Sequence, residues 1–196
     1  MENDYQTVLA GVGGQGIIYL NRVIAKAAMD LGHKVYCLEE HGMARRGGSV
    51  ATFIRFGDEI FTPVIPVGTG HLLIGFELIE AVRQVPMMND DATMILNPEL
   101  IPPFITQGEY PDKNKLLSFL KKRFSKENLI LVDAGKIAAE LGSQITKNMI
   151  LLGAASGSGV LSIDKAKLLT AIKSTSLKQY LKINQEAFKR GFETVG

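Results

Sequence analysis

Cysteine is almost absent from this 196-residue sequence, which has one, Cys37, and tryptophan is missing altogether. A single thiol excludes a disulfide framework and a zinc site built from cysteines. It also excludes a cysteine-bound iron–sulfur cluster, which needs about four thiolates. Because Cys37 lies in a short apolar run, we expect an inert thiol in a buried strand.

The sequence also lacks a large excess of positive or negative charge and a long apolar run. The net charge is only +2, which gives no reason to expect the clustered basic face of a nucleic-acid-binding domain. The longest uncharged stretch, residues 148–163, is interrupted by glycines and serines, whereas a membrane-spanning helix needs about 20 apolar residues. The acidic start of the sequence is unlike a signal peptide. We therefore expect a soluble cytoplasmic protein that binds neither nucleic acid nor a membrane.

What the sequence does contain is the periodicity of an α/β domain. Its length fits one domain, residues 1–196, and 46% of its residues are apolar. The β-branched run 7–10 predicts a buried strand, the apolar spacing over 15–31 predicts a helix, and 34–38 predicts a second strand. A strand, a helix and a strand in this order favour a right-handed crossover in a parallel sheet.

The rest of the chain continues this pattern after an interruption. Residues 39–48 are polar and glycine-rich, which predicts a loop, and two β-rich runs, 49–56 and 59–62, predict a hairpin around Gly57-Asp58. Further strands are predicted at 71–75, 93–97 and 128–132, with an edge strand at 104–106. Further helices are predicted at 77–85, 114–126, 148–157, 164–173 and 177–194. One more helix is predicted to begin at Ala134, with Asp133 as its cap. The predicted fold class is three-layer α/β/α, with a Rossmann-like, mainly parallel sheet and an inserted β-hairpin.

The first motif is a glycine turn between the first strand and the first helix. Residues 11–16 read Gly-Val-Gly-Gly-Gln-Gly and match the G-x-G-x-x-G fingerprint of dinucleotide-binding domains in the required context. Unpaired N–H groups at the helix start favour an anion. Glu39 and Glu40 end the second strand, about 20 residues on, where such domains hold a ribose. A turn of this kind also serves packing or a protein interface, so both interpretations stay open.

The second motif, residues 40–49, reads Glu-His-Gly-Met-Ala-Arg-Arg-Gly-Gly-Ser. It follows the second strand, so both motifs should meet at the carboxyl edge of the sheet, where α/β proteins bind ligands. Its two guanidinium groups suit phosphate or carboxylate, although a solvated loop with internal ion pairs is the alternative. The candidate cofactor-binding or interface residues are Gly11, Gly13, Gly14, Gln15, Gly16, Glu40, His41, Arg45, Arg46, Gly47, Gly48 and Ser49.

Known catalytic motifs are missing. The sequence contains no G-x-S-x-G, Walker A or H-E-x-x-H motif. His41 has a side chain that titrates near neutral pH, but no nucleophile is arranged beside it in the sequence. We therefore predict no catalytic residue and no metal ligand in this chain.

Together the two motifs resemble one protein family. Residues 11–16, 40–49 and 53–58 (Phe-Ile-Arg-Phe-Gly-Asp) are similar to the γ subunit of 2-oxoacid:ferredoxin oxidoreductases, the pyruvate/ketoisovalerate oxidoreductase γ family. The segment 41–44, His-Gly-Met-Ala, most resembles the small (β) subunit of indolepyruvate ferredoxin oxidoreductase. Asp133-Ala134 and residues 148–153 also look like the family, so the resemblance covers nearly the whole chain.

The resemblance implies an accessory subunit that is inactive alone. The family oxidatively decarboxylates 2-oxoacids, here indolepyruvate, another aryl pyruvate or a different keto acid, forms acyl-CoA and passes electrons to ferredoxin. Thiamine diphosphate, magnesium and iron–sulfur clusters would belong to partner subunits, with coenzyme A as co-substrate. This chain would pack on the thiamine-binding subunit and help to close the active site. The alternatives are an autonomous Rossmann-type NAD(P)-binding oxidoreductase and a regulatory module that binds a nucleotide or coenzyme A.

Overall fold

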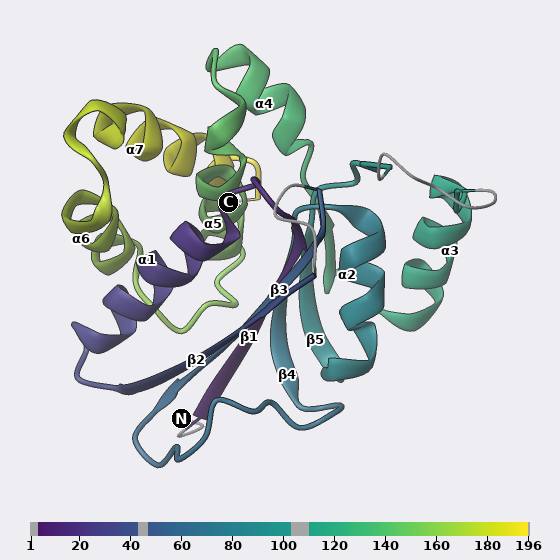
Figure 1. Cartoon of the computed structure of the whole chain (residues 1–196), viewed down its shortest axis with the longest axis horizontal. Helices are drawn as coiled ribbons and strands as arrows, with labels where there is room; N and C mark the ends of the chain where they lie inside the picture. The colour runs from purple at the N-terminus through teal and green to yellow at the C-terminus, as the bar shows by residue number, and fades with distance from the viewer. Residues whose placement is uncertain (1–3, 43–46, 103–109, 196) are drawn as a thin grey trace.

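The centre of the computed structural model, which describes residues 4–42, 47–102 and 110–195, is a six-stranded sheet (Figure 1). The strands are β1 (Asp4–Val12), β2 (Lys34–His41), β3 (Ser49–Gly57), β4 (Gly70–Gly75), β5 (Met88–Leu96) and β6 (Leu129–Leu131). Their order across the sheet is β2-β3-β1-β4-β5-β6. β1, β4, β5 and β6 pair in parallel, whereas β3 is antiparallel to both of its neighbours, β1 and β2. The described sheet is therefore mixed and mainly parallel, with β3 reversed.

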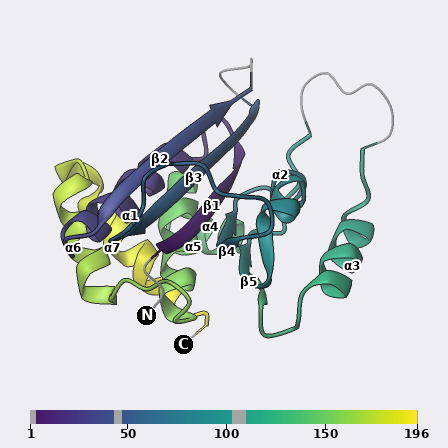
Figure 2. The same ribbon diagram turned by 90° about the horizontal axis from the view of Figure 1, so that it is seen from below.

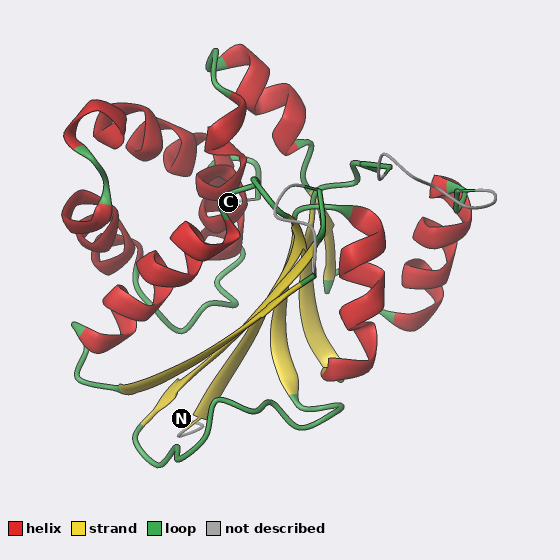
Figure 3. Cartoon of the chain, in the orientation of Figure 1, coloured by secondary structure: helices red, strands yellow, loops and turns green. Residues whose placement is uncertain are grey.

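Helices cover both faces of this sheet, as Figures 2 and 3 show. The described helices are α1 (Ile17–Met29), α2 (Leu78–Gln84), α3 (Lys113–Arg123), α4 (Ala134–Glu140), α5 (Lys147–Gly157), α6 (Lys165–Thr175) and α7 (Lys178–Phe192), with short 3-10 helices at Val85–Met87 and Gln144–Thr146. α2 and α3 lie on one face, and the other helices lie on the opposite face. This arrangement confirms the predicted three-layer α/β/α fold class.

The alternation of side chains along the strands divides the core into two parts. Val8 and Ala10 of β1 pack on the side of α2, while Leu9 between them packs on the side of α1, and none of the three is more than 1% exposed. Successive side chains of a strand point to opposite faces, so a strand covered on both faces is apolar throughout. The short run 7–10 was therefore a sound strand prediction, although β1 is longer at both ends.

The core on the side of α1 depends on a close contact between α5 and α7. Gly153 of α5 faces the carbonyl oxygen of Phe188, and Gly191 of α7 faces the carbonyl oxygen of Ile150. A Cβ atom at either glycine would overlap that oxygen. The two helix backbones approach each other so closely because neither position carries a side chain.

The prediction of a hairpin was wrong about the second strand. β3 ends at Gly57 as expected, but residues 59–62 form no strand, and β3 instead pairs with β2 over the segment 34–41. β3 lies between β1 and β2, so both of its edges are occupied and a following strand has no edge to join. Residues 39–41, predicted as loop, belong to β2, because an edge strand with little cover on its faces accepts polar side chains.

The expectation of a buried thiol is also wrong. Cys37 is exposed, because β2 forms the edge of the sheet and only two of its eight residues, Val35 and Leu38, are half-buried. The Cys37 Sγ atom lies against α1 and donates a hydrogen bond of 3.1 Å to Asn21 Oδ1. Desolvation raises the pKa of this thiol, the bond to Asn21 lowers it, and the nearby carboxylate of Glu39 raises it further.

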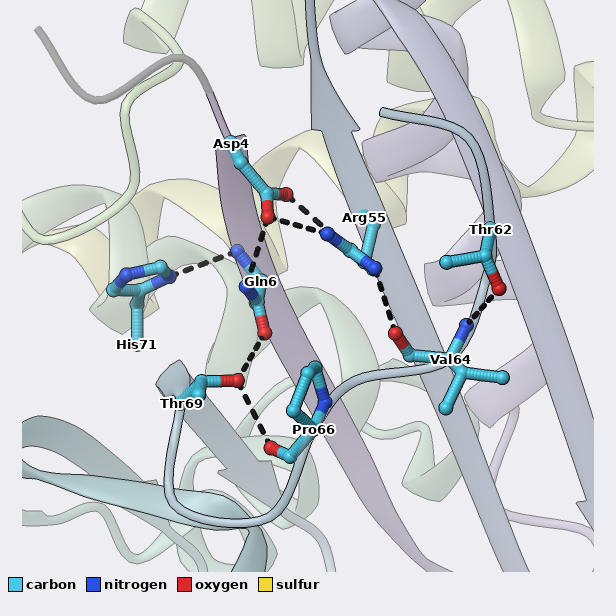
Figure 4. Close-up of polar contacts among 8 residues, drawn as sticks. All are labelled: Asp4, Gln6, Arg55, Thr62, Val64, Pro66, Thr69 and His71. Carbon is cyan, nitrogen blue, oxygen red and sulfur yellow. Dashed lines mark hydrogen bonds and ion pairs between the residues drawn. The ribbon is translucent and has the colours of Figure 1, made fainter. Parts of the chain in front are cut away.

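At the opposite, amino edge of the sheet, a polar network holds the long connection between β3 and β4 (Figure 4). Arg55 of β3 donates to Asp4 Oδ2 over 2.6 Å and to the carbonyl oxygen of Val64 over 2.7 Å. Thr69 Oγ1 donates to Gln6 Oε1 over 2.7 Å. Side chains thus hold the connection between β3 and β4 against this edge, and the two sequence motifs lie at the opposite, carboxyl edge.

Most other boundaries move by a few residues, as is usual for sequence-based assignments. α5 confirms the predicted buried helix at 148–157, and the bond from Lys136 N to Asp133 Oδ1 confirms the predicted cap of α4. The predicted edge strand at 104–106 lies outside the described residues. Within the described part of the chain, no helix is long and apolar enough to cross a membrane.

Candidate functional site

The glycine turn and the base of the arginine-containing segment meet at the carboxyl edge of the sheet, at the upper ends of the strands in Figure 1. Gly13 N donates to Gly48 O over 2.8 Å, and Gly47 N donates to Gly13 O over 3.3 Å. Gly42 N closes the segment by donating to Ser49 O over 2.8 Å. The predicted meeting of the two motifs is therefore confirmed by direct backbone bonds. Residues 45 and 46 lie outside the described residues, so the role of the two arginines stays a prediction.

The glycines of the turn are required by close approach and by backbone conformation. Gly11 still belongs to β1, and a Cβ atom there would lie 2.8 Å from Phe76 Cβ and would overlap the side chain of Gln15. Gly16 precedes α1 with a φ of 79° and faces the side-chain amide of Asn148 on α5. The absence of a side chain at Gly16 therefore lets the start of α1 approach the start of α5 closely.

Gln15 turns back into the protein and orders the turn. Its Oε1 atom accepts a hydrogen bond of 2.8 Å from Val12 N, and its Nε2 atom donates to the carbonyl oxygen of Phe76 over 3.2 Å. The first bond closes the turn on itself, and the second fastens it to the segment that follows β4. Gln15 is thus part of the framework that presents Gly14, which is exposed and whose N–H group donates no hydrogen bond within the described part of the chain.

A row of polar groups continues from Gln15 along the carboxyl edge, and sequence reasoning missed it. Asn97, which is 2% exposed, donates to the carbonyl oxygen of Phe76 over 3.1 Å and to Glu99 Oε2 over 2.9 Å. Lys147 at the start of α5 reaches the same Glu99 oxygen over 2.6 Å. Asn97 follows directly after β5, so its place at a strand end was the available signal.

A second missed pair lies on the other side of the turn, where α2 begins. Glu77 is 1% exposed; its carboxylate accepts from Glu80 N over 2.9 Å and from Ile101 N over 3.2 Å. Burial raises the pKa of Glu77, although these two hydrogen bonds oppose the shift. Glu80, 9% exposed, accepts a hydrogen bond of 2.5 Å from Ser49 Oγ. Ser49 was predicted as a site residue, but its carboxylate partner was not.

The acidic residues at the end of β2 do not occupy the place of a ribose-binding acid. β3 separates β2 from β1, so Glu39 lies two strands, about 10 Å, away from the strand that leads into the glycine turn. Glu39 also accepts a hydrogen bond of 3.3 Å from Asn21 Nδ2 and pairs with His41 over 3.4 Å. Glu40 is exposed on the same strand. The arrangement differs from a dinucleotide-binding domain, in which the acidic strand adjoins the first strand.

Two pockets of about 470 Å³ each flank the glycine turn and share Gly14 and Gly16. One opens toward the hairpin of β2 and β3 and is lined by Val12, Gly13, Gly14, Gly16, Ile17, Ile18, His41, Gly42 and Val50. The other opens toward α7 and includes Tyr19, Arg22 and Asn184. Backbone N–H groups at a helix start suit an anionic group, and the open surface around the turn gives it access. Among the described residues, no group of His, Cys, Asp and Glu could hold a metal ion.

Comparison with known proteins decides the family. The model for pyruvate ferredoxin/flavodoxin oxidoreductase matches residues 6–194. The chain belongs to this family. Indolepyruvate oxidoreductase subunit IorB of Methanothermobacter thermautotrophicus is 35% identical over 192 residues, which cover 96% of each chain. The common γ subunit of pyruvate/ketoisovalerate oxidoreductases from Pyrococcus abyssi is 31% identical and covers 93% of this chain and 92% of its own.

Solved structures share the fold of this γ-type chain. Pyruvate oxidoreductase subunit PORC of Thermotoga maritima matches with a TM-score of 0.71 at 23% identity, over 98% of this chain and 97% of that one. A 2-oxoglutarate:ferredoxin oxidoreductase of Magnetococcus marinus, solved with 2-oxoglutarate, coenzyme A and succinyl-CoA, matches with a TM-score of 0.72 at 20% identity; it covers all of this chain but 31% of that one. The predicted resemblance is confirmed: the protein is a γ/IorB-type subunit of a 2-oxoacid:ferredoxin oxidoreductase complex.

Proposed function

We propose that this subunit packs on the thiamine-diphosphate-binding subunit and forms one wall of the region that receives coenzyme A. The observation that carries the proposal is the junction of the two motifs, in which Gly13 exchanges backbone hydrogen bonds with Gly47 and Gly48. That junction brings the glycine turn next to the segment that holds both arginines of the motif. It builds a composite surface at the sheet edge where α/β proteins bind ligands.

The residues present suit a phosphate-bearing co-substrate. The N–H groups of Gly14 and Gly16 stand at the start of α1, where the helix dipole favours negative charge. In this proposal Arg45 and Arg46 neutralise phosphates or acidic groups of the partner subunit through their planar guanidinium groups. Gly11 and Gln15 keep the turn in place, and Glu40, His41 and Ser49 complete the interface. The chain contributes by positioning and electrostatics and not by proton transfer.

The redox cofactors belong to partner subunits in this proposal. Thiamine diphosphate with magnesium supplies the decarboxylation chemistry, and iron–sulfur clusters carry electrons to ferredoxin. The single cysteine of this chain agrees with clusters that lie elsewhere in the complex. We place the complex in the cytoplasm and propose that ferredoxin reaches it through the cluster-bearing subunits.

Indolepyruvate, or another aryl pyruvate, is the proposed substrate of the complex. The support comes from the IorB relatives, which are named for indolepyruvate, and from the segment His-Gly-Met-Ala at residues 41–44. The test is a substrate series on the complex purified with its co-expressed partner subunits, in which indolepyruvate should give a higher kcat/KM than pyruvate or 2-oxoglutarate. A preference for pyruvate would contradict the assignment.

The accessory role is tested by reduction of a viologen dye that depends on a 2-oxoacid and coenzyme A. The isolated chain should be inactive, and the reconstituted complex should be active. Calorimetric titration of the isolated chain with coenzyme A, NAD and NADP should give weak or no binding, because a half-site lacks the contacts of its partner. Activity of the chain alone would refute the accessory role.

The two alternatives make different predictions in the same titrations. Micromolar binding of NAD would favour an autonomous Rossmann-type oxidoreductase, but the position of β3 between β1 and β2 opposes it. Micromolar binding of coenzyme A by the isolated chain, together with full activity of a complex that lacks this chain, would favour a regulatory module.

A further inference from the structure

The hydrogen bond between Ser49 and Glu80 connects the base of the 40–49 segment to α2, on the opposite side from the glycine turn. Ser49 Oγ lies 2.5 Å from Glu80 Oε2, and Glu80 is only 9% exposed. A bond to a carboxylate that is largely removed from water is stronger than one between neutral groups. Arg83 Nε lies 3.7 Å from the other oxygen of Glu80, which is too long for a hydrogen bond.

Glu80 is itself held in place at the start of α2. Its N–H group donates to the buried carboxylate of Glu77, and the same carboxylate accepts from Ile101 N. Leu78 N donates to Glu99 O over 2.9 Å, which fixes the helix start to the segment after β5. The Glu80 carboxylate, which accepts the hydrogen bond from Ser49, therefore belongs to a helix start that is held in place by several hydrogen bonds.

Ser49 connects α2 to the glycine turn through the residues next to Ser49. Its carbonyl oxygen accepts from Gly42 N, so it closes the segment 42–49. The preceding residues, Gly47 and Gly48, exchange hydrogen bonds with Gly13. A shift of Ser49 away from α2 would displace both partners of Gly13.

We propose that Glu80 is a positioning residue of the complex, which acts through Ser49 to set Gly47 and Gly48 against the glycine turn. The effect of Glu80 on the binding of coenzyme A rests on the proposed function of the carboxyl edge. Glu80 touches no substrate in this proposal. It determines how accurately the two motifs are aligned when the co-substrate binds.

The main test is steady-state kinetics of the complex that contains Ser49→Ala. Loss of one hydrogen bond to a carboxylate should raise KM for coenzyme A about tenfold, while kcat changes by less than about twofold. Glu80→Ala should have the same effect, and the double variant should be no worse than either single one, because all three remove the same bond. Ser49→Thr keeps the hydroxyl and should restore KM. Ser158→Ala, which removes a comparable serine bond to Ala155 O at the far end of α5, should change neither constant.

Hydrogen–deuterium exchange of the isolated chain gives a second readout that does not depend on coenzyme A. In Ser49→Ala the amides of Gly13 and Gly47 should exchange faster than in the wild type, and Ser49→Thr should restore their protection. Unchanged exchange together with unchanged KM would overturn the proposal.

The glycine-turn variant Gly14→Ala distinguishes failure of the positioning role of Glu80 from failure of the proposed function of this edge. If it raises KM and Ser49→Ala does not, the positioning role fails and the proposed function stands. If neither variant changes KM although exchange at Gly13 rises in Ser49→Ala, the proposed coenzyme A region fails, and with it the effect that we assign to Glu80.

Discussion

Replacement of Gly191 by alanine should destabilise the protein markedly, because it places a methyl group into the backbone of α5. The new Cβ atom would overlap the carbonyl oxygen of Ile150 and lie 2.7 Å from its carbonyl carbon. α5 and α7 must then separate, and the buried side chains between them, Phe188 among them, lose close contact. Overpacking of this kind costs about 3 kcal/mol, at the upper end of the usual range, because the clash involves backbone. The higher helix propensity of alanine returns about 1 kcal/mol, so the net loss is about 2 kcal/mol.

The measurement is urea and thermal unfolding of the isolated chain followed by circular dichroism. A loss of about 2 kcal/mol lowers Tm by about 4–8 °C in a domain of this size. Gly135→Ala on α4 is the matched control, because a Cβ atom there would lie 3.6 Å from Asp133 Oδ1, an ordinary van der Waals distance. Its Tm should not fall. The close contact of the two helices would be refuted if Gly191→Ala unfolded at the wild-type temperature.

Three further predictions concern single side chains. Burial raises the pKa of Glu77 above its ordinary value of 4.5, so the folded state binds the proton more tightly than the unfolded state. The free energy of unfolding should therefore fall as pH rises from 4.5 through the raised pKa, and Glu77→Gln should flatten that slope in urea titrations at several pH values. Cys37 is exposed, so Ellman's reagent should modify it in the folded chain without loss of secondary structure. Because its pKa is raised, the reaction at pH 8 should be slower than that of a free thiol. Complete protection of Cys37 would contradict its place on an edge strand. Asn97→Asp removes two donated hydrogen bonds and places a second carboxylate beside Glu99, which should lower stability by about 2 kcal/mol, and an unchanged urea midpoint would show that the row of polar groups contributes nothing.

The elements that could be predicted best from the sequence are those that are mostly buried. The run 7–10 and most of the helix at 148–157 are buried and mainly apolar because helices and strands surround them, and such segments are recognised without knowledge of their neighbours. The cap at Asp133 depends on local geometry alone and was also predicted. The position of both motifs at the carboxyl edge followed from the order of these elements, whereas the family resemblance rested on residues 11–16, 40–49 and 53–58.

The pairing of the strands could not be predicted in the same way. Whether residues 59–62 form a strand depends on which edges of the sheet are free, and β2 already occupies the outer edge of β3. The exposure of Cys37 has the same origin, since a β-rich run on an edge strand has the composition of a buried one. The acceptors of Ser49 and Gln15 come from segments 31 and 61 residues away, so no local pattern indicated them.

The reversed strand β3 has a consequence for how this family can diversify. Because β2 and β3 are antiparallel neighbours, the segment between them starts and ends at the same place, where Gly42 and Ser49 share a hydrogen bond. A doubling of the length of such a closed segment costs only about 0.6 kcal/mol in closure entropy. Because the segment leaves and re-enters the sheet at adjacent positions, a change in its length between Gly42 and Ser49 requires no change in the pairing of β2 with β3. If the segment contacts a partner or ligand as we propose, changes in it would alter that contact without altering the sheet that carries it.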